Sequence, residues 1–189
     1  MAKISSGINF TSDYFLGTFY TNNRDASKKT TRGNFSNVEL AFEDSRALTR
    51  AAKRLKRNDY TASADDGDIT ESVKASIEAF ASTYNNMIES GKESDDSETK
   101  RYVKQLKTLT KKHAEELEEI GITIENDGKL SVNSELLSMA DNTAVSKLFS
   151  PEEEYVKKSL TIASRLNNAA YNDILAQINT KNLHINITI

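Results

Sequence analysis

The chain has 189 residues, which is enough for one domain with terminal segments and too few for a multidomain enzyme. Its 28 acidic residues outnumber its 25 basic residues, and the net charge of −3 argues against general nucleic-acid binding by the whole chain. With no cysteine and only two histidines, disulfides, cysteine nucleophiles and metal sites built from thiolates or several histidines are excluded. The single proline and seven glycines permit long helices, so the composition predicts a soluble, helical, non-catalytic protein.

The amino-terminal segment, residues 1–37, is predicted to be an arm followed by a polar linker. It lacks the apolar stretch of about 7–15 residues that marks a secretory signal peptide. No part of the chain reaches the roughly 18 apolar residues of a membrane span. We expect the aromatic part of the arm either to pack on the domain or to dock a partner or a neighbouring subunit. Its aromatic residues are Phe10, Tyr14, Phe15, Phe19 and Tyr20.

Residues 38–57 are predicted to form a helix whose second half is strongly basic. Such a patch can contact nucleic acid or an anionic membrane. Acidic residues follow directly at 59–71, however, and we expect them to neutralise the patch within the fold, so no nucleic-acid partner is predicted. The basic residues are Arg46, Arg50, Lys53, Arg54, Lys56 and Arg57.

A second helix is predicted from Asp68 to about Gly91. Asp68 and Glu71 have the spacing of a capping box, in which two side chains satisfy free backbone amides at the start of a helix. Gly91 suits the left-handed conformation that often follows the end of a helix. The apolar residues recur in steps of four and three, which is typical of a helix that packs along one stripe. They are Val73, Ile77, Phe80, Tyr84 and Met87.

A third helix is predicted over residues 98–119, followed by a β-hairpin over residues 121–132. The helix carries Leu106 and His113 on its inner face, and we expect His113 to be a structural residue bonded to a neighbouring helix. Asp127-Gly128 fits a tight type I′ turn, in which both central residues need positive φ. We expect one face of the hairpin to pack on the helices. That face carries Ile122, Ile124, Leu130 and Val132.

Two short helices, one long helix and an alternating tail complete the predicted elements. The short helices contain Leu136 and Leu148-Phe149, and Ser150-Pro151-Glu152-Glu153 has the features of a helix start: a serine cap, proline at the first position and glutamate at the third. The long helix is expected to end near Ile178. The tail, residues 180–189, has a strand pattern that could add a third strand to the hairpin or join an edge on another chain. Its apolar residues are Leu183, Ile185, Ile187 and Ile189.

These elements together predict a mostly α fold, an antiparallel helical bundle or coiled coil with one small hairpin. We divide the chain into an arm and linker (1–37), a helical domain (38–179) and a tail (180–189). No glycine-rich phosphate loop, GxSxG or HExxH motif is present, so we predict no catalytic, cofactor-binding or metal-binding residues and no enzymatic activity. The run Asn126-Asp127-Gly128 lacks the twelve-residue calcium loop with its terminal glutamate.

The stretch from Ile77 to Phe149 resembles the carboxy-terminal region of flagellar filament-capping proteins, the hook-associated cap family. Tyr84-Asn85 looks like the pair that ends one helix in that family. The run from Gly121 to Val132 looks like its Gly-Ile-Thr, Asp-Gly, Leu-Ser hairpin. Further residues follow in the family's order: Leu106, Leu109 and Leu117 before the hairpin, and Leu136, Val145, Leu148 and Phe149 after it.

The resemblance implies a structural or interaction protein, without a cofactor, that is similar to the helical stalk seating a cap at a filament end. Its expected partners are further copies of itself, flagellin or hook-associated proteins. Its expected location is extracellular, on the bacterial flagellum, after export without a cleaved signal. The alternative is an intracellular helical adaptor or a flagellar export chaperone in the cytoplasm. Genomic context near flagellin or hook genes would favour the first interpretation.

Overall fold

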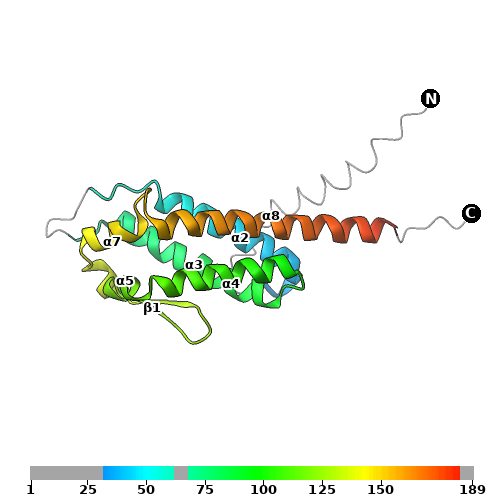
Figure 1. Ribbon diagram of the computed structural model, residues 1–189, viewed down its shortest axis with the longest axis horizontal. Coiled ribbons are helices and arrows are strands. Elements are labelled where there is room, and N and C mark those ends of the chain that lie inside the picture. Colours follow the sequence, from blue (N-terminus) through cyan, green and yellow to red (C-terminus); the bar gives the residue numbers. More distant parts are fainter. Residues whose placement is uncertain (1–31, 62–67, 184–189) are drawn as a thin grey trace, which may run out of the picture.

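A computed structural model describes residues 32–61 and 68–183, with side chains described up to Gln177. Within these ranges the chain is mostly helical with one two-stranded antiparallel sheet, so the predicted fold class is confirmed. The long helices lie side by side along the longest axis of the molecule (Figure 1). They are α2 (Asn37–Leu55), α3 (Glu71–Glu93), α4 (Ser97–Lys112) and α8 (Glu154–Leu183).

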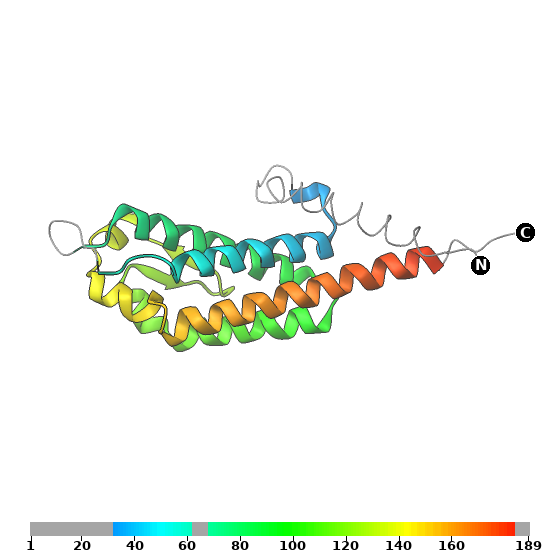
Figure 2. The same ribbon diagram turned by 90° about the horizontal axis from the view of Figure 1, so that it is seen from above.

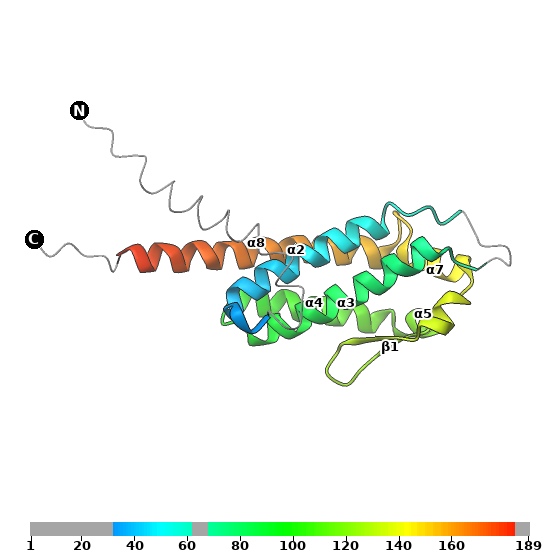
Figure 3. The ribbon, with the colours of Figure 1, turned by 180° about the vertical axis from the view of Figure 1, so that it is seen from behind.

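The four long helices form a bundle in which α2 packs against α3 and α8, and α4 packs against α8 and α3. The last turns of α8 run past the ends of the other helices (Figure 2). Apart from η1, which precedes α2 at the other end of the bundle, the short elements gather where α4 ends, and the hairpin folds back along the bundle (Figure 3). The short elements are η1 (Arg32–Asn34), α5 (Ala114–Glu119), β1 (Ile122–Ile124), β2 (Leu130–Val132), α6 (Ser134–Ser138) and α7 (Asn142–Phe149).

The aromatic centre of the core lies where α3, α7 and α8 meet. The Phe80 ring lies 6.2 Å from the rings of both Phe149 and Tyr155, in edge-on contact. Such pairs add about 0.5–1.5 kcal/mol beyond the burial of their area. The core continues under the hairpin, because Ile122 and Leu130 are 1% and 4% exposed. This single contiguous core therefore joins the hairpin to the bundle.

Two predicted features of α3 are wrong. The helix is capped by Thr70, whose hydroxyl accepts a hydrogen bond from the Val73 amide, whereas the backbone of Asp68 pairs with that of Asp141 in an isolated antiparallel β-bridge. At the other end the helix continues through Gly91 to Glu93. A Cβ at position 91 would collide with Cγ2 of Val103 on α4, so the glycine permits close packing of the two helices.

The predicted third helix is interrupted at His113, which separates α4 from α5. The predicted bond from His113 to a neighbouring helix is also wrong. Its ring packs on Tyr155 of α8, with centroids 5.3 Å apart, while Nδ1 lies 3.5 Å from Glu116 in the same segment and Nε2 has no hydrogen-bond partner among the residues that the structure describes. His113 is therefore held by packing against an aromatic ring. The spacing of apolar residues along the sequence does not reveal such a contact.

The hairpin exists where predicted, but its turn is of a different type. The Gly128 amide donates to the Glu125 carbonyl (2.8 Å), and the Glu125 amide donates to the Lys129 carbonyl (2.8 Å). Gly128 has a φ of +88°, whereas no non-glycine residue in the described ranges, Asp127 included, has a positive φ. The connection is therefore a three-residue loop, a type I turn followed by a left-handed glycine, because it has one residue more than a type I′ turn accommodates.

The start and end of the last helix also differ from expectation. Ser150 ends α7, with its amide bonded to the Ser146 carbonyl, and residues 151–153 form a turn before α8 begins at Glu154. At the other end, residues 180–183 are helical, so the strand pattern does not hold there. The remaining tail residues Ile185, Ile187 and Ile189, and with them any third strand, lie outside the described residues.

Candidate protein interaction site

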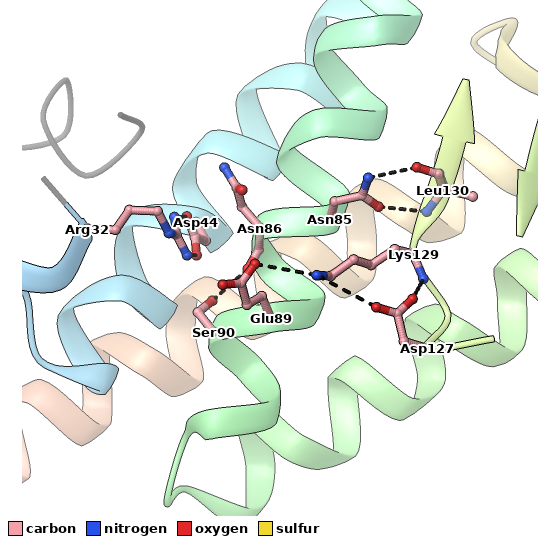
Figure 4. A network of polar contacts seen from close by, with 9 residues as sticks. All are labelled: Arg32, Asp44, Asn85, Asn86, Glu89, Ser90, Asp127, Lys129 and Leu130. Atoms are coloured by element: carbon pink, nitrogen blue, oxygen red, sulfur yellow. Dashed lines mark hydrogen bonds and ion pairs between the residues drawn. The ribbon is translucent and has the colours of Figure 1, made fainter. Parts of the chain in front are cut away.

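The hairpin is held on α3 by two consecutive side chains, Tyr84 and Asn85. The Asn85 amide group donates to the Leu130 carbonyl and accepts from the Leu130 amide, both at 2.7 Å (Figure 4). One side chain thus takes the place of a neighbouring strand along β2. The Tyr84 hydroxyl donates to the Gly128 carbonyl at 3.1 Å, and burial raises the pKa of Tyr84 to about 12, so it remains a donor at neutral pH.

Two lysines and their partners hold the tip of the hairpin. Lys107 of α4 donates from Nζ to the Asp127 carbonyl at 2.6 Å, and its stem covers Gly128, where a Cβ would collide with it. Lys129 places its Nζ between Glu89 of α3 (3.5 Å) and Asp127 (3.7 Å) (Figure 4). The backbone amide of Lys129 donates to Asp127 and lowers the pKa of that carboxyl. The tip is therefore tied to both α3 and α4.

A groove of about 570 Å³ lies between α3, α4 and the hairpin tip. Ile88, Gly91 and Val103 form its floor, and they are buried. The acidic residues in its wall are Glu89, Glu93 and Asp127. Lysines outnumber them, and we call this site the lysine groove. Its lysines are Lys92, Lys100, Lys104, Lys107, Lys111 and Lys129.

Four of these lysines follow one face of α4 in steps of four, three and four, at positions 100, 104, 107 and 111. Residues at such steps lie above one another on a helix, so they form one continuous stripe. Our sequence analysis did not identify this stripe, although the spacing is present in the sequence. Only the structure shows that the stripe borders a groove, because α3 and the hairpin supply the other wall.

The remaining predicted residues fall into three groups. The aromatic arm residues at positions 10–20 lie outside the described residues, and Leu183 belongs to α8 with no described side chain. Asp127 is exposed and Gly128 is partly buried at the hairpin tip. The other predicted core and hairpin residues are all buried, at 4% exposure or less: Val73, Ile77, Phe80, Tyr84, Leu106, Ile122, Leu130, Leu148 and Phe149.

Two arginines in the basic half of α2 contact residues of α2 and α3. Arg46 lies 3.6 Å from Glu43 on the same helix, and Arg54 donates to the Ser76 hydroxyl of α3 at 3.0 Å. Asp65 and Asp66, two of the acidic residues expected to neutralise the patch, lie outside the described residues. Near the start of α2, Arg32 forms a two-pronged ion pair with the buried Asp44, at 2.8 and 2.9 Å (Figure 4).

Within the described ranges no three histidine, aspartate or glutamate side chains are grouped so that they could hold a metal ion. No helix there is long and apolar enough to cross a membrane. The chain matches no family model, no curated protein and no solved structure. The contacts between the hairpin and α3, together with the lysine groove, are therefore the features that indicate a function.

Proposed function

We propose that this protein is a non-enzymatic structural protein, similar to the helical stalk of a flagellar filament cap, that binds flagellar subunits or further copies of itself. The observation that best supports this proposal is the attachment of the hairpin to α3. Tyr84 and Asn85, which carry the resemblance on that helix, bond directly to Gly128 and Leu130, which carry it in the hairpin. Residues that carry the resemblance in two separate parts of the sequence are thus in direct contact in the fold.

The short helices after the hairpin support the same proposal. Val145 and Leu148 are at most 1% exposed, and Phe149 packs on Phe80 of α3. Leu117, before the hairpin, is also fully buried. Leu136 differs, because it is 51% exposed on α6 and contributes to the surface instead of the core. The segment from Ile77 to Phe149 therefore behaves as one packed unit with a small apolar surface.

The shape of the molecule suits a stalk better than an enzyme. The four long helices run along one axis, and the hairpin lies beside them (Figures 1 and 2). We propose that the partner is contacted by two aromatic residues of the arm, Phe15 and Phe19, and by two residues of the tail, Ile185 and Ile187. This contact would form outside the cell, on the bacterial flagellum. A segment that alternates apolar and polar residues can pair as an added strand with the edge of a partner's sheet.

The test is direct binding of the full chain to purified flagellin and hook-associated proteins from the same organism. We expect a Kd in the micromolar range or tighter, and at least a tenfold loss for Phe15→Ser/Phe19→Ser or Ile185→Ser/Ile187→Ser. Tyr102→Ser, which removes an aromatic ring from α4, is the matched control and should bind like the parent.

Absence of binding to every flagellar subunit would overturn the proposal. Binding to unassembled subunits but not to filament ends would instead favour the export chaperone.

A further inference from the structure

The lysine groove carries a net positive charge, because its six lysines outnumber the three acidic residues that line it. Lys107 and Lys129 are engaged by the hairpin tip, whereas the exposed side chains of Lys100, Lys104 and Lys111 form no ion pair with any described residue. Their stems can line the groove while their ammonium groups stand at its rim. The groove therefore offers apolar walls and a charged edge to an acidic partner.

The same chain carries a surface of opposite charge on α5. Glu115, Glu118 and Glu119 are exposed and form no ion pair within the described part of the chain. Glu118 shares a depression with Leu136, which is 51% exposed. Leu136 and Met139 are the two large hydrophobic side chains that the described residues leave exposed, and they lie in or next to α6. We call Glu115, Glu118, Glu119 and Leu136 the acidic face.

The lysine groove and the acidic face match in spacing and in chemistry. Glutamates three and four residues apart on a helix repeat at about 5–6 Å, the same interval as lysines three and four residues apart on α4. The exposed Leu136 beside the glutamates corresponds to the apolar walls between the lysines. Both surfaces therefore combine charge at the rim with an apolar centre, as protein interfaces do.

The two surfaces of one molecule cannot meet. The groove lies beside α4 and the hairpin tip, whereas α5 lies at the end of the bundle where α4 terminates (Figure 1). Both are built on packed elements of the same core. Contact between a groove and an acidic face consequently requires two molecules, arranged head to tail.

We propose that the lysine groove binds the acidic face of a second copy of this chain. Contact between two different surfaces leaves one of each free on every pair, so the assembly can grow into a ring or a filament. A nucleic-acid ligand is disfavoured, because Glu89, Glu93 and Asp127 line the groove and no arginine or aromatic ring is present there to grip phosphates or stack on bases. This proposal deepens the proposed function, since it names one partner.

The test uses the full chain alone, in sedimentation velocity at rising protein concentration and at about 20 and about 300 mM salt, where the Debye length falls from about 20 Å to about 6 Å. We expect self-association that weakens at least tenfold at the higher salt. Lys100→Glu/Lys104→Glu and Glu118→Lys/Glu119→Lys should each weaken it at least tenfold, and an equimolar mixture of the two variants should restore it. Lys53→Glu/Arg57→Glu, on exposed residues away from the groove, changes the net charge equally and should associate like the parent.

Circular dichroism establishes that each variant is folded. A parent that stays monomeric at low salt, a control that weakens association equally, or a mixture of folded variants that fails to associate would each overturn the proposal. Binding to flagellin is measured separately with the same proteins. If the protein binds flagellin but does not self-associate, the proposed function stands and this inference fails. If it self-associates as described but does not bind flagellin, this inference stands and the proposed binding to flagellin fails.

Discussion

At the scale of single residues, the hairpin depends on one amide side chain. A lone two-stranded hairpin is marginally stable in water. Asn85 bonds both backbone groups of Leu130 and thereby gives β2 a substitute for a third strand. Tyr84, one residue earlier, bonds the carbonyl of Gly128 at the tip. Two adjacent residues therefore tie the middle and the tip of the hairpin to α3.

We expect Asn85→Ala to destabilise the protein by about 1–3 kcal/mol, because it leaves a partly buried amide and carbonyl of Leu130 without partners. Urea unfolding measures the loss, and hydrogen exchange at the Leu130 amide should become faster. Asn86→Ala is the matched control, since no side-chain hydrogen bond of Asn86 is among the described contacts (Figure 4). Equal effects of the two substitutions would contradict the assigned role.

At the scale of elements, helix contacts decide where glycine is used. Gly91 has the sequence context of a helix end, yet α3 continues past it. Its missing side chain provides the space that Val103 occupies, so α3 and α4 approach closely at this point. By contrast, Gly121 and Gly128 both have positive φ, at +79° and +88°, and serve the chain reversals around the hairpin.

We expect Gly91→Ala to cost about 1–3 kcal/mol through overpacking, even though alanine favours helix more than glycine. Val103→Ala should remove the clash, so the double variant should lose clearly less stability than the two single losses added together. Thermal or urea unfolding of the four proteins in this cycle provides the measurement. Additive losses would show that the two side chains do not compete for the same space.

At the scale of the whole molecule, the bundle has a buried carboxyl group that couples its stability to pH. Glu43 of α2 is 2% exposed, and neither carboxylate oxygen has a hydrogen-bond partner among the described residues. Burial raises its pKa to about 7, although Arg46 and Arg50 oppose the shift. Because the pKa is higher in the folded state, protonation of Glu43 favours folding. This contribution is complete below the unfolded pKa of about 4.5 and is lost as the pH rises through about 7.

Replacing Glu43 with glutamine should therefore stabilise the protein by about 1–3 kcal/mol at pH 8 and have little effect at pH 5. Urea unfolding at several pH values measures the difference. Glu125→Gln, on an exposed residue of the hairpin loop, is the control and should show no such pH dependence. An effect of Glu43→Gln that is the same at pH 5 and pH 8 would contradict the buried-acid interpretation.

The sequence by itself determined most of the helical segments and the position of the hairpin. The apolar stripe that includes Val73, Ile77 and Phe80 requires a helix that buries one face. Alternating residues around Asp127-Gly128 require two short strands and a reversal. Both patterns are local, because they follow from the repeat of 3.6 residues in a helix and of two in a strand. For this reason the fold class and the position of the hairpin were predicted correctly.

Only the tertiary structure decided how these segments end and which surfaces they form together. Helix ends are set by the residues that cap them in the folded chain: Thr70 and not Asp68 caps α3, and Ser150 ends α7 instead of starting α8. The lysine groove needs α3, α4 and the hairpin tip at once, and the joint between Asn85 and Leu130 spans 45 positions. Such contacts have no period along the chain. They arise from packing between distant segments, which local sequence patterns do not encode.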